Sequence, residues 1–563
     1  MAPDPHNVAV AIHQDDSVSP GEKHDVDAIH NETKDSFVKG VLSDVGYQAA
    51  IDETLKEPEK PWVVFKRNPR MVLIMVSVLL NGIVSGIELN MAGNMLGISA
   101  FARQFGNWEE ASNSYVIPAK YISIWSAVSS PFQLFGMIFS SVAGDWIGRR
   151  PVLYFILLFC VGGAFLESFV KTWTGWLGAK IVMAFATGLM QAGVATYISE
   201  VSPRELRGIS LSTFNMFMNT GNLFSVLISY GTQKTWPSVT DDRSFRVPLY
   251  ICIALPVFIF ACEVFLVPES PSFLIMRRKH DQARKALRWM YPRLNEEEIN
   301  LKVAEIAYTV MKESEIDEEN KTASFLDCFK GVDARRSFCA IFPAMSQPLC
   351  GNMLCGPYAT YFFAMAGFNN SLAATAIVLS IGFACNIGVF FLIDRKAVGR
   401  WAILFYGLIL MFVGDLGIGI VGSVHSDVQS SNSAQALVIL FVCILTTGSV
   451  SGPGAVGWTY TGESGSMRLR AKTNTLGNLG NASIAWVLGS TISFMMTDLS
   501  LNTGYFYAGM AAMSVAIVYF FIPDYTGRSF AQVDELFERR IAPRKFASTV
   551  CTGDYGREPV VEV

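Results

Sequence analysis

Twelve stretches of about 20 mostly apolar residues, each bounded by charged or turn-forming residues, dominate this sequence. A helix of about 20 apolar residues crosses the hydrocarbon core of a bilayer, so each stretch is a candidate transmembrane helix. Composition agrees, because hydrophobic residues make up 51% of the 563 residues and charged residues only 16%, whereas soluble domains carry about 25% charge. The sequence therefore predicts an all-α polytopic membrane protein.

The stretches form two groups of six. We expect them to begin near Met71, Lys120, Val152, Thr174, Ile209 and Pro248, and near Phe338, Leu372, Ala402, Ala434, Thr473 and Thr503. This spacing predicts a disordered N-terminal tail (1–66), a six-helix half (67–267), a charged central loop (268–337), a second six-helix half (338–522) and a polar C-terminal tail (523–563). The tail before the first span has no signal-peptide pattern, so we expect the first span to act as the insertion signal.

Basic residues are concentrated in alternate loops. One side carries the central loop, both tails and the loop residues Arg149, Arg150, Arg204, Arg207, Arg395, Lys396, Arg400, Arg468, Arg470 and Lys472. The other side is poorer in charge, with the exceptions Arg103, Lys171, Lys234, Arg243 and Arg246. Basic loops stay in the cytoplasm, so we expect both termini to be cytoplasmic.

Short motifs recur in the same order at offsets of about 250 residues, as repeats do. The pairs are DWIGRR (145–150) with DRKAVGR (394–400), SEVSPRELR (199–207) with ESGSMRLR (463–470), and PESP (268–271) with PDYTG (523–527). This order favours two pseudo-symmetric six-helix halves, an arrangement found among transporters with a binding site near the membrane midplane.

Enzymatic and metal-dependent functions are not indicated. The ten cysteines include no metal-binding spacing, and the six histidines are scattered. No catalytic triad or phosphate-binding loop is present, and the central loop is too short for a nucleotide-binding domain. We expect no enzyme activity, no cofactor, no metal and no nucleic-acid partner.

These motifs resemble those of the sugar porter family of the major facilitator superfamily. DWIGRR, SEVSPRELRG, PESPSFL and GWTYTGESGSMRLRAK are similar to segments that follow the second, fourth, sixth and tenth spans of that family. The segments SQPLCGNMLCGPYATYFF and PDYTGRSFAQVDELFERRIAPRKFAST resemble the fungal α-glucoside permeases. The resemblance implies the major facilitator fold, with twelve transmembrane helices, and secondary transport of a small organic solute by alternating access.

Two ionisable residues lie within predicted spans. A carboxylate in hydrocarbon is costly and is usually functional, and Glu88 lies inside the first span. The family places an Asp here, so the resemblance implies that Glu88 carries a proton. Lys180 stands where the family usually has an Arg paired with that acid, so we expect Lys180 to pair with Glu88, unless it extends to the membrane surface.

Four residues match positions where sugar porters bind their substrate: Asn215, Gln347, Trp458 and Asn481. Amides suit hydroxyl-rich ligands, and an indole packs on a sugar ring, although each residue could instead make a contact between helices. Three departures, Pro348, Met353 and Cys252, replace polar residues of the family. They favour a less hydroxylated substrate than a free disaccharide.

Charged and glycine residues lie at the predicted cytoplasmic helix ends. We expect a latch between the halves, which would alternate with the transport cycle, from Asp145, Gly148, Arg149, Arg150, Glu200, Arg207, Gly399, Arg400, Glu463, Arg468 and Arg470. The alternative is that these charges only set the topology.

Asn369-Asn-Ser371 is a glycosylation sequon on the predicted outer side. The sequence as a whole predicts a monomeric, proton-coupled transporter of a sugar, α-glucoside or related solute in the plasma membrane. The alternatives are an exporter or carrier of a fungal metabolite on the same scaffold, and a non-transporting solute sensor. Only about 40 residues follow the last span, which argues against a sensor.

Overall fold

The structure is a computed structural model that describes residues 61–110, 114–321, 324–368, 370–392, 399–424, 431–466, 469–526, 528, 530–546, 548–549 and 551. Contacts divide the chain into two compact units, Lys60–Pro268 with Glu319–Val563, and Met1–Glu59 with Glu269–Glu318. The first unit holds the helical bundle, and the second holds α12 (Pro271–Met276), α13 (His280–Met290) and most of α14 (Glu296–Lys321). The expected N-terminal tail lies largely outside the described residues.

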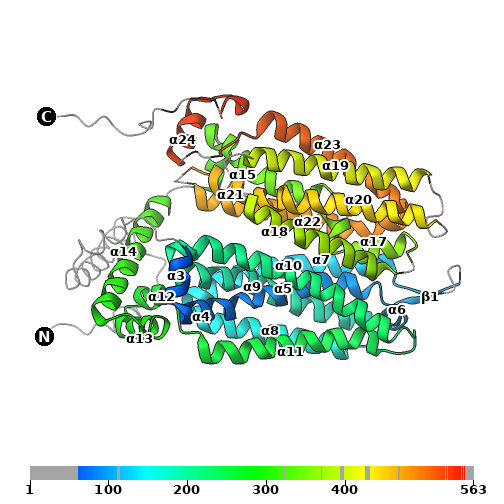
Figure 1. Ribbon diagram of the computed structural model, residues 1–563, viewed down its shortest axis with the longest axis horizontal. Coiled ribbons are helices and arrows are strands. Elements are labelled where there is room, and N and C mark those ends of the chain that lie inside the picture. Colours follow the sequence, from blue (N-terminus) through cyan, green and yellow to red (C-terminus); the bar gives the residue numbers. More distant parts are fainter. Residues whose placement is uncertain are drawn as a thin grey trace, which may run out of the picture. The chain divides into compact units, whose positions relative to one another are not determined.

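The first half of the bundle contains α3 to α11 and a short β-hairpin (Figure 1). Its elements are α3 (Pro61–Arg67), α4 (Pro69–Leu79), α5 (Asn81–Met95), α6 (Ser99–Phe105), β1 (Asn107–Glu109), β2 (Ser114–Val116), α7 (Ala119–Ile147), α8 (Arg149–Phe169), α9 (Trp173–Val201), α10 (Arg204–Thr235) and α11 (Arg243–Leu266). The two strands pair antiparallel, with Trp108 opposite Tyr115. The sequence patterns did not predict this hairpin.

The second half contains α15 to α24. Its elements are α15 (Gly331–Leu349), α16 (Asn352–Cys355), α17 (Ala359–Met365), α18 (Ser371–Leu392), α19 (Arg400–Val424), α20 (Asn432–Ser451), η3 (Pro453–Gly457), α21 (Trp458–Ser464), α22 (Arg470–Leu499), α23 (Thr503–Phe521) and α24 (Phe530–Glu538). All twelve expected starts lie within a few residues of an observed helix start or inside its first turns.

Nine segments of the described chain are long and apolar enough to cross a membrane by themselves. One of them, Lys472–Phe521, contains two helices, α22 and α23. The remaining two of the twelve spans are α10, which is rich in Asn, Thr and Ser, and the interrupted α15–α17. Helices that face other helices or a polar cavity need less apolar surface than helices that face lipid, which explains the lower apolar content of these two spans.

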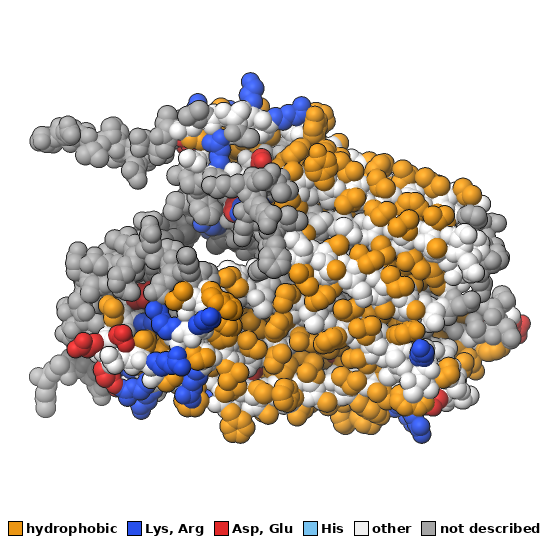
Figure 2. Space-filling view, in the orientation of Figure 1, with side chains coloured by type: hydrophobic (Ala, Val, Ile, Leu, Met, Phe, Trp, Pro, Cys, Tyr) orange, Lys and Arg blue, Asp and Glu red, His pale blue; other side chains and the backbone are white. Residues whose placement is uncertain are grey.

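The outer surface of the bundle is apolar. Figure 2 shows hydrophobic side chains spread across the bundle on the face in view, with few charged groups between them. Exposed members include Phe135, Ile138 and Phe139 on α7 and Phe258 and Phe265 on α11. A surface of this kind is stable against lipid acyl chains and not against water, so the protein is an integral membrane protein.

Hydrogen bonds among the described residues join the two halves. Thr360 Oγ1 donates to Asn94 Oδ1 at 2.9 Å, the hydroxyls of Ser123 and Ser493 are 2.6 Å apart, and Trp486 Nε1 donates to the Ala127 carbonyl at 2.8 Å. Gly93 packs directly on the backbone of the second half, since a Cβ there would lie 1.8 Å from the Pro357 carbonyl oxygen. These contacts cluster toward the end of the bundle that carries β1 and β2, which we term the hairpin end.

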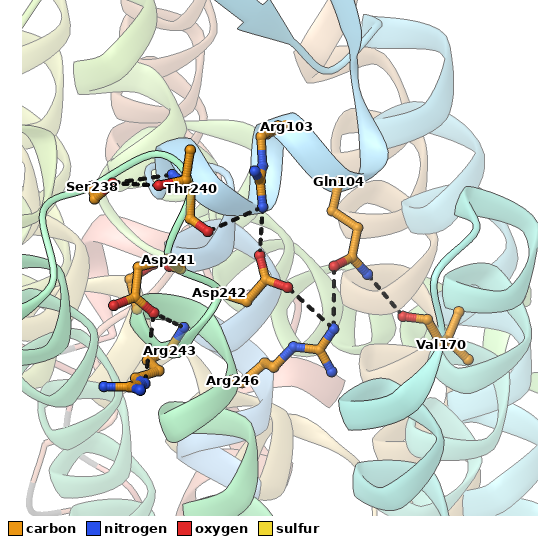
Figure 3. A network of polar contacts seen from close by, with 10 residues as sticks. Arg103, Gln104, Val170, Ser238, Thr240, Asp241, Asp242, Arg243 and Arg246 are labelled. Atoms are coloured by element: carbon orange, nitrogen blue, oxygen red, sulfur yellow. Dashed lines mark hydrogen bonds and ion pairs between the residues drawn. The ribbon is translucent and has the colours of Figure 1, made fainter.

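The hairpin end also contains the basic residues that departed from the charge pattern. Arg103 donates to Asp242 at 2.8 Å, and Arg246 forms an ion pair with the same carboxylate at 3.5 Å (Figure 3). Arg243 lies 3.9 Å from Asp241. Acidic partners therefore neutralise these cations locally, which explains why they do not disturb the overall asymmetry of charge.

Helices fill two segments that were predicted only as a charged loop and a polar tail. In the central segment, Ser270 caps α12 through a hydrogen bond from the Phe273 amide to its hydroxyl. After the last span, α24 packs on the start of α15, where the Arg336 guanidinium donates to Asp534 at 2.6 Å. Phe537 and Phe546 stack edge to face beside this pair and are fully buried. The described part of the C-terminal segment is therefore a folded cap.

Glycine-mediated helix crossings supply a test of this packing. A Cβ on Gly188 of α9 would lie 1.9 Å from the Gln133 carbonyl oxygen of α7, whereas a Cβ on Gly178 of the same helix meets nothing within 4 Å. We expect Gly188→Ala to force the helices apart and to destabilise the fold by about 1–3 kcal/mol. Gly178→Ala is the matched control and should be neutral or slightly stabilising. Thermal unfolding of both purified variants measures the difference, and equal midpoints would contradict the close crossing.

Candidate functional site

A buried ion pair joins α8 to α9 inside the first half. Lys180 Nζ lies 2.8 Å from Glu167 Oε1, and the exposed fractions of the two side chains are 9% and 0%. The ammonium group also lies 5.2 Å from the centre of the Trp176 ring, which stabilises a cation through the ring face. Lys180 therefore points into the protein, and the alternative that it extends to the membrane surface is wrong.

Glu88 on α5 is the third member of this cluster. Its exposed fraction is 6%, and neither carboxylate oxygen has a geometric hydrogen-bond partner in the described part of the chain. Lys180 and Glu167 are both within electrostatic range of it, and the Cys252 thiol of α11 lies beside it. The expected pairing of Lys180 with Glu88 is not the arrangement seen, because Glu167 occupies the cation.

This cluster has a simple charge balance. Two carboxylates share one ammonium group in a site from which water is largely excluded. A buried carboxylate without a counter-charge is far less stable than its protonated form. In this conformation Glu167 holds Lys180, so Glu88 is the acid of the cluster without an ion-pair partner among the described residues. Cys252, which we expected to line the substrate pocket, instead adjoins this acid.

Glu167 was not among the predicted site residues, although it is an ionisable residue in a mostly apolar run. Glu167 is the only acid of α8 and lies close to its end, in the run FLESF. An acid near a predicted span end reads as solvated, because span edges are uncertain by a few residues. Helix α8 continues to Phe169 and Glu167 is fully buried, so the residue lies inside the bundle.

Three of the four expected substrate residues lie on adjoining elements of the second half. Gln347 of α15 packs against the π-helical turn η3, where a Cβ on Gly454 would lie 2.8 Å from its Nε2. Trp458 begins α21 directly after this turn and is 39% exposed. Asn481 of α22 donates to the Ala344 carbonyl of α15 at 2.7 Å, so its amide nitrogen makes a contact between helices.

Asn215 comes from the first half, on α10, and its side chain is exposed. Further amides on neighbouring helices add polar groups that the sequence analysis did not single out. Asn90 donates to Asn222 at 2.7 Å, between α5 and α10. Ser449 donates to Asn352 at 2.8 Å, which links α20 to the interrupted seventh span. Their signal was available, since each amide lies inside a predicted span.

The charged residues expected to latch the halves form pairs within each half. Arg149 donates to Glu200 at 2.9 Å and lies 3.1 Å from Asp145, while Arg400 pairs with Glu463 in the second half. We term this end of the bundle the basic end. The hydrogen bonds between the halves lie toward the hairpin end, so the latch pairs would meet across the halves only in another conformation.

The other expected latch residues are placed as follows. Gly148 and Gly399 have φ values of 105° and 67°, which suit glycine at the tight turns before α8 and α19. Arg150 donates to the Val264 carbonyl at 3.0 Å. Arg207 is exposed and Arg470 is half-buried. Arg468 and the sequon residue Asn369 lie outside the described residues.

Comparison with known proteins gives a consistent family. The profile of the family described as "Sugar (and other) transporter" matches residues 73–537. The general alpha-glucoside permease of Saccharomyces cerevisiae is 28% identical over 501 residues, which cover 86% of this chain and 77% of the permease. The MFS transporter fmqE of Aspergillus fumigatus is 25% identical over 483 residues, which cover 83% of this chain and 86% of that transporter.

Solved structures share the fold. The inward open conformation of the xylose transporter XylE from E. coli superposes with a TM-score of 0.65 at 15% identity, covering 83% of this chain and 99% of that one. The MFS proton:xylose symporter XylE bound to 6-bromo-6-deoxy-D-glucose gives a TM-score of 0.60 at 19% identity, with coverage of 83% and 99%. The chain therefore has the major facilitator fold.

The buried pair can be tested by breaking and then balancing it. Glu167→Gln leaves Lys180 buried without a carboxylate at 2.8 Å, and loss of one partner of a buried pair costs about 3–5 kcal/mol. We expect the double variant Glu167→Gln with Lys180→Gln to recover much of that loss, because no unpaired charge remains. The control is Glu88→Gln, which resembles a protonated Glu88 and should change stability little. Thermal unfolding of the three variants measures this order, and a neutral Glu167→Gln would contradict the pairing.

Proposed function

Because this chain belongs to the sugar (and other) transporter family, we propose that it imports a glycoside or related small solute together with a proton. The observation that carries the proposal is the buried cluster of Glu88, Glu167 and Lys180, in which one cation serves two acids. Such a cluster holds one proton in addition to the ion pair. Proton and solute movement can be linked when the position of that proton depends on which side of the membrane is open.

The cycle follows from competition for Lys180. In the conformation seen here Lys180 is held by Glu167, and Glu88 is without a partner, which favours its protonated form. If Lys180 turns toward Glu88 in another conformation, Glu88 loses its proton, and Glu167 must then accept one or meet water. Alternating access therefore becomes coupled to proton transfer by a movement of one side chain.

Orientation follows from the charges at the two ends. We place the basic end in the cytoplasm and the hairpin end outside, in the plasma membrane, with both termini cytoplasmic and a monomer as the functional unit. In that orientation the contacts between the halves close the outer side, and the protein is in an inward-facing state. The intra-half pairs of Arg149 and Arg400 fit this state, because a latch at the cytoplasmic side would be released in it.

The substrate class is supported by the C-terminal half. Trp458 supplies an exposed aromatic face, and Gln347 supplies an amide on the adjacent helix. Relatives are named as permeases of alpha-glucosides and as hexose transporters, which favours a sugar-like ring. Pro348 and Met353 stand where the family has polar groups, and both are buried near the helix break of the seventh span. This favours a ring with fewer free hydroxyls, such as a glycoside with an apolar aglycone.

Export of a less polar metabolite is the second candidate. The same apolar replacements motivate it, and the matching MFS transporter fmqE shows that the scaffold is not confined to proteins named for sugars. Direction distinguishes the two candidates: uptake into cells or proteoliposomes supports import, and efflux from preloaded ones supports export.

Loss of proton coupling is the first expected result. Glu88→Gln cannot release a proton, so we expect it to abolish accumulation against a gradient while exchange and downhill flux continue. Counterflow and uphill uptake in proteoliposomes with an imposed proton gradient measure the two processes separately. A variant that still concentrates its solute would exclude Glu88 as the proton carrier.

Substrate affinity is the second expected result. A buried hydrogen bond left unmade costs about 1–3 kcal/mol, or roughly five- to a hundred-fold in affinity. We therefore expect Gln347→Ala and Trp458→Ala to weaken binding by about that range, while Phe258→Ala, at an exposed residue of α11 in the first half, changes it little. Competition of maltose and glucose with apolar glycosides gives the preference, and Met353→Asn should shift it toward sugars. Tight and selective maltose transport by the unaltered protein would contradict a site poor in polar groups.

A further inference from the structure

Asp415 is the only acid of α19 and lies in the interior of the second half. Its exposed fraction is 0%, and neither carboxylate oxygen has a hydrogen-bond or ion-pair partner among the described residues. Two other acids buried in this bundle have a partner: Glu167 pairs with Lys180, and Glu263 accepts from Asn81 at 2.6 Å. Asp415 therefore lacks the partner that an ionised group at this depth requires.

The carboxylate lies directly on the break in the seventh span. Gly351 joins α15 to α16 and has a φ of 86°, in the left-handed region. A Cβ on Gly351 would lie 2.8 Å from Asp415 Oδ1 and 3.1 Å from Oδ2. The acid thus fills the space that the missing side chain leaves, and any movement at the break changes its surroundings.

Every ionisable group that faces Asp415 is weakly acidic or neutral in this setting. These groups are Cys350, directly after α15, Cys355 of α16 and Tyr507 of α23. The Cys350 thiol donates to Ser514 of α23 rather than to the acid. The adjoining α20 carries no Lys, Arg, His, Asp or Glu. No cation of the described chain therefore forms an ion pair with Asp415.

The other half gives an informative comparison. Helices α8 and α19 are the third spans of their halves, and both begin at the arginine of a Gly-Arg pair, Arg149 and Arg400. Glu167 lies 18 positions after Arg149, and Asp415 lies 15 positions after Arg400. The two acids differ by three positions, about one helical turn, so they occupy the same helix face. The first half supplies a cation from the next span, and the second half does not.

We propose that Asp415 is a second proton-binding site, and that its proton holds the α15–α16 break in the conformation seen here. A protonated acid is neutral and can remain in dry contact with Gly351. When α16 moves away, water reaches the carboxylate and takes the proton. The ionised group then cannot return to the dry site until it is protonated again.

The break is connected to closure of the hairpin end. Beyond α16, the Pro357 carbonyl packs on Gly93 of α5, and Thr360 donates to Asn94. Both contacts join the halves, so displacement of α16 and α17 opens the hairpin end. The inference rests on the alternating access of the proposed function, but not on proton coupling through Glu88. High pH at the hairpin end is therefore expected to favour the open state.

The test uses the full-length protein with a cysteine at Ser123, which is buried at the contact between the halves. Its labelling by a membrane-impermeant maleimide is divided by the labelling of a cysteine at the exposed Ser238, which corrects for the reactivity of thiols at each pH. Between pH 5 and pH 8 we expect this ratio to rise, by up to about tenfold per pH unit since one proton is bound. In the Asp415→Asn background it should stay low at every pH.

Two further variants make the outcome decisive. Asp415→Ala also lacks the proton and should give a ratio that does not depend on pH, even if Asp415→Asn folds poorly. Glu263→Gln should keep the pH response, because this buried acid of the first half accepts from Asn81 and has no part in either proposal. A pH response that survives both changes at Asp415 overturns the proposal, and so does a response to sodium ions in place of protons. The absence of proton-coupled uptake would contradict the proposed function but would not change the labelling ratio. The labelling ratio therefore tests the inference on Asp415 separately.

Discussion

The requirement that every backbone amide in hydrocarbon be hydrogen-bonded shapes this protein more than any single contact. Continuous helices meet that requirement unaided, and ten of the twelve spans in the described chain are continuous or nearly so through the membrane. The two clear interruptions, at Gly351 in the seventh span and at the π-helical turn Pro453–Gly457 in the tenth, lie inside the second half where other helices cover them. Gln347 packs against the second interruption and Asp415 against the first. Irregular backbone is tolerated only where protein or a polar cavity surrounds it, so its location marks the covered interior of the second half.

Burial of charge imposes the second constraint, because an unbalanced charge in this interior is unstable. The first half resolves it with Lys180, which one acid holds while the second acid remains without a partner. The basic residues at the ends are balanced differently: Arg400 with Glu463 and Arg103 with Asp242 are partly exposed to solvent and can exchange partners at low cost. A cluster that is rigidly buried can store a proton, and pairs near water can form and separate with the conformational cycle. Ion pairs of the same residue types therefore have different roles in the interior of the bundle and near its ends.

Much of the fold could be predicted from the sequence because the bilayer makes hydropathy a strong signal. The apolar runs gave the number of helices, and the paired motifs such as DWIGRR gave the two halves, both in agreement with the observed fold. The helices of the central segment and the cap formed by α24 were missed, since amphipathic helices outside the membrane have no comparable length requirement. The site was only partly predictable. Glu88 and Lys180 were found because ionisable residues in apolar runs are conspicuous, but the pairing of Lys180 with Glu167 depends on which helices adjoin at one depth. That information lies in the crossing of α8 and α9, which no local pattern contains.

The two halves have the same helix arrangement but differ in how the buried acid of the third helix is balanced. Each has an acid at nearly the same place on its third helix, Glu167 in one and Asp415 in the other. In the first half the fourth helix contributes Lys180, and the acid forms an ion pair that binds α8 to α9. In the second half the corresponding helix α20 has no cation, and a Cβ on Gly414 of α19, next to Asp415, would lie 2.8 Å from Leu445 of α20. Such close packing leaves little room for a long basic side chain, which fits our proposal that a proton neutralises the acid. Duplication supplied equivalent positions, and the packing of each half decided whether a lysine or a proton would balance the charge.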